Sequence, residues 1–356
     1  KKCPQGQEHM AHRPARGRVM SKLINQEIDS LLKETSRSFY LTLKALPSRI
    51  RSQVGLLYLL ARIADTIADS ESDSTEEMLQ ALEQYNERIQ GRSDVLPDLG
   101  DLAKIQSNPA EKKLLENIAA PVACIEHFSG VDQDRIRECL DIIISGQTLD
   151  LQRFGQSNEG DISPLATEEE LDDYTYRVAG SVGEFWTHMT LEHMFKNDAK
   201  TEAQFFDTGV RFGKALQLIN ILRDIPEDLR LGRCYIPVGS LAKYDLQVSD
   251  LLDKENMNQF RPLFDSYIDR AAAHLDAAVE YIALLPSSQF RLRAACMLPV
   301  LIGQRTLILL RTQNVLDAEN RVKVLRPEIK RLKNKTILAM FSRRRSLKLL
   351  AKNRDA

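Results

Sequence analysis

The sequence predicts an all-α protein with a single main domain. Apolar residues recur at intervals of three and four along most of its 356 residues, which is the period of an amphipathic helix. Signals for strands are nearly absent, because no Asn-Gly dipeptide marks a hairpin and no segment of about 20 to 50 residues repeats. No shift in composition divides residues 21–320, so we expect them to fold together.

Helical periodicity and capping signals set the elements of the first half of the chain. Pro47 ends the first predicted helix. Ser74 or Thr75 is the expected N-cap of the third, and the stretch 91–109, rich in Gly, Pro, Asp and Ser, is an expected loop. The predicted helices are 22–44, 49–69, 74–89, 110–128 and 132–151.

A polar connection, FGQSNEGDISPLATEEEL, opens the second half, and segments of this kind can act as lids. Within it, Thr167 and Glu170 form the capping-box pattern that starts the next helix. Pro226 should bend or tighten a central helix in 211–237, and Pro299 should kink a later one. The predicted elements are the helix carrying LDDYTYRVAGSVGEFWTHM, the central helix, and helices near Val248, at 261–285 and at 290–311.

The central helix has an apolar face and a polar face. The apolar face carries Phe212, Leu216, Ile219 and Leu222 at helical spacing. The polar face carries Gln217, Asn220, Asp224 and Asp228. Asp65 and Asp69 repeat the four-residue spacing of the two aspartates at the end of the strongly apolar helix 49–69. Two apolar helices therefore each present a pair of carboxylates.

Paired carboxylates at this spacing can hold a Mg²⁺ ion that also binds a diphosphate. They lie about 5–6 Å apart and repel each other by about 0.2–0.5 kcal/mol unless a cation lies between them. Mg²⁺ is usually held by one or two carboxylates together with substrate phosphates and water. Arg62 and Arg223 stand beside the pairs, and a guanidinium binds phosphate oxygens with two donors. A solvated acidic face is the alternative for either pair alone, but the recurrence favours helices that face each other across one site.

Small residues form a stripe in the helix that precedes the central one. Gly183 follows Ala179 by four positions and Gly180 by three, and a glycine inside a helix costs about 1 kcal/mol relative to alanine. Two explanations are open. A neighbouring helix approaches closely there, or the stripe leaves room for a long apolar substrate.

Charge and composition exclude some classes of protein and of location. The net charge of −1 argues against a nucleic-acid-binding protein. Residues 321–354 carry thirteen Lys and Arg against Glu328 alone, so the tail is a basic patch on an acidic body. Its stretch ILAMFSRRRSLKLL is weakly amphipathic and is either a peripheral contact to an anionic membrane or a solvated basic helix.

The location expected from the sequence is cytoplasmic, without a transmembrane anchor. No uncharged apolar run reaches the roughly 18 residues that span a bilayer. Five scattered cysteines make no C-x-x-C pattern and are typical of reduced thiols. Residues 1–20 are polar and basic without the apolar core of a signal peptide, so we expect a disordered leader or an expression remnant.

Four motifs, in order, resemble the squalene/phytoene synthase family. They are TSRSF (35–39), ARIADTIAD (61–69), YTYRVAGSVGEF (174–185) and QLINILRDIPEDLRLGRCYIP (217–237). The resemblance spans roughly residues 30 to 310. It implies an isoprenoid-synthase-type helical bundle around a central cavity, and Mg²⁺-dependent head-to-head joining of two prenyl diphosphates. Terpene cyclases also use metal-bound aspartates, but the SRSF and YTYRVAG motifs speak against a cyclase.

The resemblance also implies a role for individual residues. Its magnesium ligands correspond to Asp65, Asp69, Asp224 and Asp228. Its diphosphate-binding residues correspond to Ser36, Arg62, Gln217, Asn220, Arg223 and Tyr235, of which Arg62 and Arg223, with Tyr174, are the expected catalytic residues. Tyr174 matches a tyrosine implicated in proton handling during cyclopropane formation. The expected prenyl pocket is Val178, Ala179, Gly180, Val182 and Gly183.

Within the family, the sequence favours a squalene synthase that acts on farnesyl diphosphate through presqualene diphosphate. Three features favour this assignment. They are the motif TSRSF, the residues CMLP at 296–299, and the extension RVKVLRPEIKRL. Lys323 and Arg326 resemble basic residues linked to NADPH binding, which the reductive second step would need. The alternative is a phytoene or dehydrosqualene synthase, which loses a proton instead. A non-catalytic scaffold of the same family is a further alternative, although it should have lost metal carboxylates.

Overall fold

The structure, a computed structural model, describes residues 26–35, 40, 43–70 and 74–354 and confirms the all-α class. The helices of the first half are α1 (Gln26–Thr35), α3 (Ser48–Ala68), α4 (Thr75–Ile89), α5 (Gly100–Ile105), α6 (Pro109–Glu116), α7 (Ala119–Cys124), η2 (Ile125–His127) and α8 (Gly130–Phe154). Those of the second half are α9 (Glu168–Thr175), η3 (Tyr176–Gly180), α10 (Ser181–His193), α11 (Ala199–Arg230), α12 (Val238–Ala242), η4 (Val248–Leu252), η5 (Lys254–Asn256), α13 (Met257–Leu284), α14 (Phe290–Thr312), α15 (Arg326–Ala339) and α16 (Arg343–Arg354).

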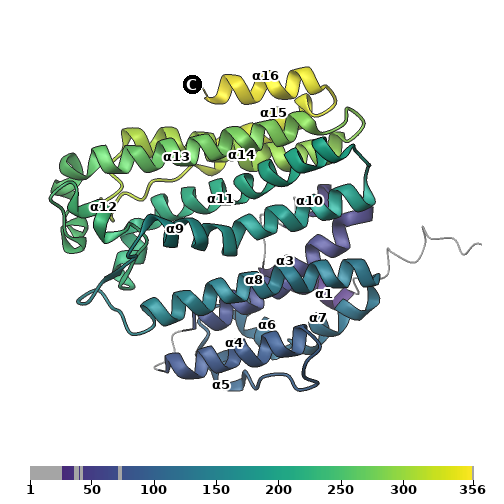
Figure 1. Cartoon of the computed structure of the whole chain (residues 1–356), viewed down its shortest axis with the longest axis horizontal. Helices are drawn as coiled ribbons and strands as arrows, with labels where there is room; N and C mark the ends of the chain where they lie inside the picture. Colours follow the sequence, from purple (N-terminus) through teal and green to yellow (C-terminus); the bar gives the residue numbers. More distant parts are fainter. Residues whose placement is uncertain (1–25, 36–39, 41–42, 71–73, 355–356) are drawn as a thin grey trace, which may run out of the picture.

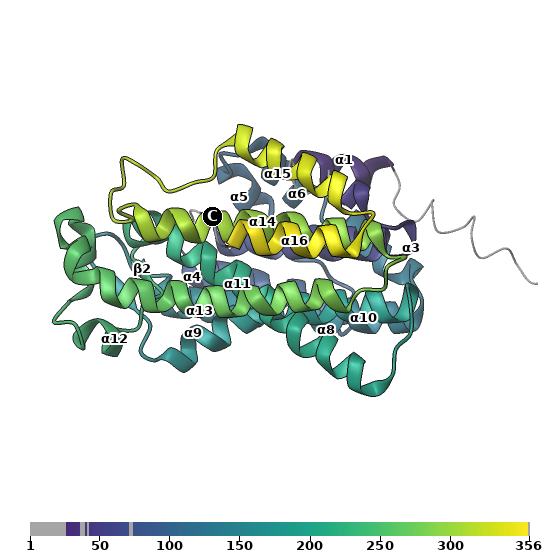
Figure 2. The same cartoon turned by 90° about the horizontal axis from the view of Figure 1, so that it is seen from above.

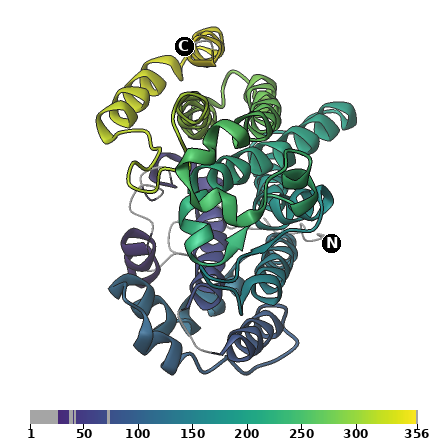
Figure 3. The same ribbon diagram turned by 90° about the vertical axis from the view of Figure 1, so that its left-hand side faces the viewer.

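The long helices stack in layers around α11 (Figure 1). Helices α13 to α16 form one side, α9 to α11 lie in the middle, and α3 with α8 forms the next layer. The shorter helices α4 to α7 cover the opposite side, so the yellow C-terminal helices and the blue early helices lie at opposite ends of Figure 3. Helix α11 packs against α10, α13 and α14, whereas α3 packs against α4 and α8. The two helices with paired aspartates therefore belong to different layers.

Most predicted helix boundaries agree with the structure, and the capping predictions hold. Ser74 is the N-cap of α4, and its hydroxyl accepts a hydrogen bond from the backbone N–H of Glu77. Thr167 caps α9 by accepting from the N–H of Glu170 at 3.3 Å. The Glu170 carboxylate accepts from the backbone N–H of Ala166 at 2.7 Å, so the return bond of the capping box goes to the residue before the cap.

Two predictions in the first half were wrong in detail. The predicted helix 110–128 is divided into α6, α7 and η2. Pro121 accounts for the break before α7, because it has no N–H to donate to the carbonyl of Asn117, four residues earlier. The predicted loop 91–109 contains the short helix α5, whose Leu102 and Ala103 are buried.

The chain stays helical through Pro226 in α11 and through Pro299 in α14.

A two-residue parallel ladder fixes the polar connection that the sequence suggested as a lid. Strand β1 (Ser163–Pro164) pairs with β2 (Arg233–Cys234). Gly232, just before β2, has φ of +76°, and a Cβ on it would lie 2.3 Å from the backbone nitrogen of Asn158. The connection is therefore tied to the segment that follows α11.

The small-residue stripe begins in a π-helical turn, η3, that the sequence did not reveal. The turn occupies Tyr176–Gly180, between α9 and α10. Such turns are rare and are often found at functional sites. The structure puts it beside the cavity described next, since Tyr174 and Val178 both line that cavity.

Helices α15 and α16 of the basic tail lie on α13 and α14 (Figure 2). Gln304 donates to the carbonyl of Leu350 at 3.2 Å, and Asn353 donates to the carbonyl of Leu301 at 3.1 Å. The tail is thus folded against the body. The separation of residues 321–356 from 21–320 as distinct regions stays a prediction, and residues 1–20 lie outside the described part of the chain.

Candidate functional site

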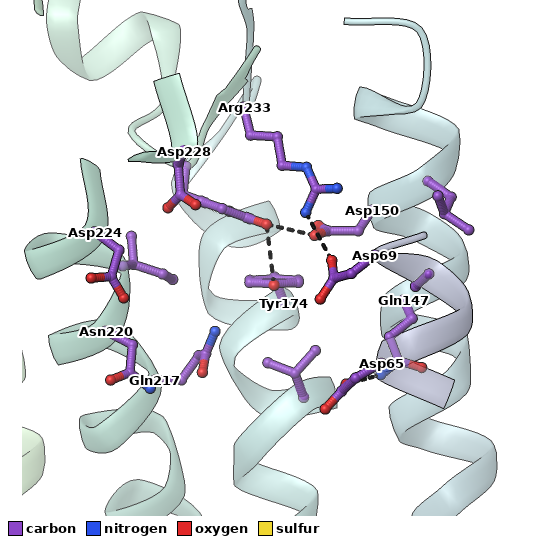
Figure 4. Close-up of a pocket in the computed structure, with 15 residues that line it drawn as sticks. Asp65, Asp69, Gln147, Asp150, Tyr174, Gln217, Asn220, Asp224, Asp228 and Arg233 are labelled. Carbon is purple, nitrogen blue, oxygen red and sulfur yellow. Dashed lines mark hydrogen bonds and ion pairs between the residues drawn. The ribbon is translucent and has the colours of Figure 1, made fainter. Parts of the chain in front are cut away.

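A cavity of about 320 Å³ opens between α3, α8, α9, η3 and α11 (Figure 4). Nine of the residues that the sequence singled out line it: Asp65, Asp69, Tyr174, Val178, Gln217, Asn220, Asp224, Asp228 and Tyr235. The remaining lining residues are Ala68, Gln147, Asp150, Leu151, Ile221 and Arg233. Segments more than a hundred residues apart in the chain therefore meet at one polar site.

The two aspartate pairs stand on opposite walls of this cavity. Figure 4 shows Asp65 and Asp69 on one side, and Asp224 and Asp228 with the polar face of α11 on the other. Asp65 accepts a hydrogen bond from Gln147 of α8. Asp69 accepts from Arg233 at 3.4 Å. The predicted face-to-face arrangement of two carboxylate helices is what the structure has.

Burial and neighbouring negative charges raise the pKa values of two of the four aspartates. Burial, with the neighbouring Asp69, raises the pKa of Asp65 to about 6. Burial, with the neighbouring Asp224, raises the pKa of Asp228 to about 7. The Asp228 side chain makes no hydrogen bond or ion pair with any residue in the described ranges. A cation between the walls would lower both pKa values.

The residues fit Mg²⁺ as a group completed by substrate. Carboxylate and amide oxygens are the hard ligands that Mg²⁺ prefers. Within the described residues, no cluster of three or more His, Cys, Asp or Glu side chains is arranged to hold a metal by itself. A Mg²⁺ ion held here would take one or two ligands from each wall and complete its shell with water and phosphate oxygens.

Neither predicted catalytic arginine lines the cavity. Arg62 forms an ion pair with Glu111 of α6. Its Nη1 also lies 3.9 Å from Oδ2 of Asp65. Arg223 donates to both oxygens of Asp224, at 2.8 and 2.5 Å. Burial raises the pKa of Asp224, but hydrogen bonds from Arg223 and Arg321 outweigh it and hold that pKa below its usual value. Contact of Arg62 and Arg223 with a diphosphate stays a prediction.

A chain of hydroxyl groups along the cavity wall ends at the carboxylate of Asp150. Tyr174 donates to the hydroxyl of Tyr235 at 3.2 Å, and Tyr235 donates to Asp150 Oδ2 at 2.5 Å. The two tyrosine rings are stacked with their centroids 4.8 Å apart. Burial, then the charge of Asp150, raises the pKa of Tyr174 well above 10, so its hydroxyl is neutral at physiological pH. Burial raises the pKa of Asp150 to about 6.

Sequence reasoning missed three polar residues of the site. Gln147 and Asp150 lie three apart on α8, and Arg233 follows α11. Their signal was present, because the i, i+3 spacing places both α8 side chains on one helix face. Glu138 and Asp141, two other acidic residues of α8, do not line the cavity.

The small-residue stripe is a close contact between helices. A Cβ on Gly183 would lie 1.9 Å from the carbonyl oxygen of Gly209 in α11, and one on Gly213 would lie 2.0 Å from the carbonyl oxygen of Ala179. The first explanation of the stripe therefore holds. Of the five residues expected in a prenyl pocket, Val178 lines the cavity, whereas Val182 is 36% exposed. A role for Ala179, Gly180, Val182 and Gly183 beside a prenyl chain stays a prediction.

Three further expected site residues do not line the cavity or lie outside the described part of the chain. Ser36 lies outside the described part of the chain. Lys323 and Arg326 are exposed, and neither lines the cavity, so a role for them in binding NADPH stays a prediction. Helix α14 is long and apolar enough to span a membrane, but 61% of its apolar window is buried inside the protein.

Comparison with known proteins agrees with this geometry. The structure of TcSQS in complex with the ligand E5700 superposes with a TM-score of 0.75 at 22% identity, over 92% of this chain and 90% of that one, which shows the all-α isoprenoid synthase fold. A bifunctional lycopene cyclase/phytoene synthase of Blakeslea trispora is 29% identical over 77% of this chain and 43% of its own length. The 15-cis-phytoene synthase of Synechocystis is 29% identical over 70% of this chain and 66% of its own length.

The chain spans about two fifths of the length of the bifunctional relatives. A model of the squalene/phytoene synthase family matches residues 32–328, which is most of the chain. Members of that family are head-to-head prenyltransferases that use Mg²⁺ and bind farnesyl or geranylgeranyl diphosphate. This protein belongs to the squalene/phytoene synthase family.

Proposed function

We propose that this protein joins two prenyl diphosphates head to head to form a cyclopropyl diphosphate. The observation that carries the proposal is that two aspartate pairs, from α3 and α11, line opposite walls of one cavity (Figure 4). Asp65 and Asp69 on one wall, with Asp224 and Asp228 on the other, would hold Mg²⁺. Bound Mg²⁺ would neutralise the charge that develops on the leaving diphosphate.

The chain's own residues bind the substrate and exclude water. Gln217 and Asn220 present amide groups from the α11 wall, where they can hydrogen-bond phosphate oxygens. Val178, Leu151 and Ile221 supply apolar lining. An apolar lining protects a carbocation from water, which would otherwise capture it.

Tyr174 is the proposed proton acceptor during closure of the cyclopropane ring. A neutral phenol accepts a proton only if it passes on its own. The hydrogen bonds from Tyr174 to Tyr235 and from Tyr235 to Asp150 supply that path, because each hydroxyl donates to the next oxygen. Tyr174→Phe should therefore lower formation of the cyclopropyl product.

The second step separates the two members of the family considered for this chain. Squalene formation from farnesyl diphosphate with NADPH is the reading from the sequence motifs. Loss of a proton to dehydrosqualene or phytoene is supported equally, because the similar proteins include phytoene synthases. Both share the first step proposed above.

Product analysis tests the proposal and separates these outcomes. Purified protein is incubated with Mg²⁺ and farnesyl or geranylgeranyl diphosphate, with and without NADPH, and the extracts are analysed by mass spectrometry. We expect a C30 cyclopropyl diphosphate from farnesyl diphosphate without NADPH, and squalene when NADPH is added. Dehydrosqualene or phytoene independent of NADPH would establish the alternative. No turnover, with Asp65→Asn as inactive as the wild type, would favour a scaffold.

We also propose that the turn between α15 and α16 contacts an anionic membrane surface. Leu338 and Phe341 are 75% and 70% exposed, and Ile337 beside them is 46% exposed. The ring of Phe341 lies 5.3 Å from that of Phe290, and Arg293 holds the turn by donating to the carbonyl of Met340 at 3.0 Å. The surrounding exposed basic residues are Lys330, Arg331, Lys333, Lys335, Arg343, Arg344 and Arg345.

A membrane fits this surface better than a solvated helix does. Apolar side chains within a basic rim combine partitioning into the bilayer with attraction to anionic headgroups, worth about 1 kcal/mol per Lys or Arg near the surface. The farnesyl or geranylgeranyl diphosphates that this family binds also carry long apolar chains, which favour a lipid surface. The cytoplasmic location stays part of this proposal.

A further inference from the structure

The segment between α14 and α15, residues 313–325, crosses the protein without helical structure. We refer to it as the strap. Arg261 donates to the carbonyl of Gln313 at 2.7 Å, and Asn314 donates to the carbonyl of Lys254 at 2.9 Å, so the strap is held where it leaves α14. Val322 near its other end is buried. Figure 2 shows the strap as the loop that leaves the end of α14 and turns back to α15.

One side chain of the strap reaches the acidic site. Arg321 Nη2 donates to Asp224 Oδ1 at 2.6 Å, and its Nη1 lies 2.9 Å from Glu227 Oε1. Arg223 donates to Asp224 from the helix itself. Oδ1 of Asp224 therefore has two donors and Oδ2 has one, whereas the Asp228 side chain has none among the described residues. Arg321 brings a cation to the one member of this pair that is already neutralised.

A guanidinium and a metal ion compete for the same carboxylate oxygen. A carboxylate oxygen has two lone pairs, and both of those on Asp224 Oδ1 have a hydrogen-bond donor. Coordination of a divalent cation at Oδ1 requires one donor to leave, and like charge favours the same result. Arg321 is the donor that leaves more readily, because it is on a non-helical segment and its side chain is 45% exposed, against 29% for Arg223.

We propose that Arg321 is an internal counter-ion that occupies Asp224 in the metal-free protein and moves away when Mg²⁺ binds, which couples metal loading to the position of the strap. This inference rests on the proposed role of Asp224 in binding Mg²⁺. The coupling is reciprocal. The contact of Arg321 with Asp224 weakens metal binding by the same factor by which bound metal weakens that contact. The released guanidinium keeps the two-donor geometry that binds phosphate oxygens.

Metal titration of the full chain without substrate tests the competition. Mn²⁺ binding, measured by paramagnetic resonance, and Mg²⁺ binding, measured by calorimetry, are compared for wild type, Arg321→Gln and Lys352→Gln. We expect Arg321→Gln to bind metal about three- to tenfold more tightly, because the competing cation is gone. Lys352→Gln removes the same charge from an exposed position that lines no part of the cavity, and we expect it to match the wild type.

The direction of the change in metal affinity decides whether the inference holds. Affinity unchanged or weakened in Arg321→Gln, or tightened equally in Lys352→Gln, would overturn the inference. Wild type that binds no metal, or Asp224→Asn that binds as well as the wild type, would overturn the proposed metal site itself and the inference with it. The two failures are therefore distinguishable.

Hydrogen exchange of the strap gives a second readout that needs no turnover. In the wild type, we expect amide exchange across residues 313–325 to become faster when Mg²⁺ is added. In Arg321→Gln, we expect exchange to be fast from the start and insensitive to metal. A strap whose exchange ignores Mg²⁺ in the wild type, although calorimetry shows binding, would contradict the coupling.

Discussion

Four aspartates of the same spacing differ sharply in their surroundings. Asp224 accepts hydrogen bonds from two arginines, which hold its pKa below the usual value against the effect of burial. Asp228, one turn later, has neither partner, and burial with the charge of Asp224 raises its pKa to about 7. The spacing of the two residues is identical to that of Asp65 and Asp69, so the difference comes from which cations the fold places nearby.

The raised pKa of Asp228 makes the stability of the metal-free protein depend on pH. A carboxyl group whose pKa is higher in the folded than in the unfolded state contributes stability below the unfolded value, near 4, and that contribution is lost as pH rises toward 7. From pH 4 to pH 7.5, we expect the unfolding free energy of the wild type to fall by roughly 1–3 kcal/mol relative to Asp228→Asn.

Chemical denaturation in metal-free buffer across this pH range measures the difference. Asp207→Asn is the matched control, because Asp207 is on the same helix but exposed and away from the cavity. A gap between wild type and Asp228→Asn that does not change with pH would show that the site supplies no such penalty.

At the level of elements, α11 is positioned by direct contact of backbones. Gly183 of α10 meets Gly209 of α11, and Ala179 of η3 meets Gly213 one turn further on. These contacts fix the position of α11 along α10 and η3. Helix α11 in turn presents Gln217 and Asp224 to the cavity. The cost of glycine in the two helices is offset by packing that no larger residue allows.

Gly183→Ala should therefore be strongly destabilising. The added Cβ would lie 1.9 Å from a backbone oxygen, and backbone cannot rotate away as a side chain can. We expect a loss of about 1–3 kcal/mol in the unfolding free energy, the usual cost of overpacking. Thermal and denaturant unfolding check the value.

Gly130→Ala is the control for this change. Gly130 is the first residue of α8, and a Cβ there meets nothing within 4 Å. Alanine is the better helix former, so we expect the control to be neutral or slightly stabilising. Equal losses at both positions would contradict the close helix contact.

On the scale of the whole molecule, the basic tail is both a structural layer and a surface. Helices α15 and α16 are held to α13 and α14 by buried polar groups such as Gln304 and Arg293. This packing leaves the apolar turn at Leu338 and Phe341 projecting among Lys and Arg side chains. An apolar turn among basic side chains suits the proposed contact with a bilayer.

Vesicle sedimentation tests the membrane surface. We expect the wild type to bind vesicles of phosphatidylcholine with phosphatidylglycerol, but not phosphatidylcholine alone, and high salt to weaken binding. The double variant Leu338→Ser, Phe341→Ser should lose most of it, because each side chain contributes about 1.5–3 kcal/mol when buried. Val95→Ser removes an equally exposed apolar side chain from a loop elsewhere. Binding unaffected by the double variant would count against the surface.

The sequence by itself determined the fold class, the positions of most helices, and the two aspartate pairs. These follow from local rules, since helical periodicity, caps and i, i+4 spacing depend on neighbours in the chain. It also pointed to nine residues that line the cavity. The break near Pro121 was readable in principle, because a proline inside a predicted helix is itself a local signal.

Only the tertiary structure decided which groups meet. The pairing of Arg62 with Glu111, the path from Tyr174 to Asp150, and the contact of Arg321 with Asp224 join segments dozens of residues apart. Such contacts arise from the packing of layers, which local periodicity does not encode. The same holds for the small-residue stripe, whose meaning was open until α11 was seen against Gly183. Pattern fixes which residues a helix can offer, whereas packing fixes what they touch.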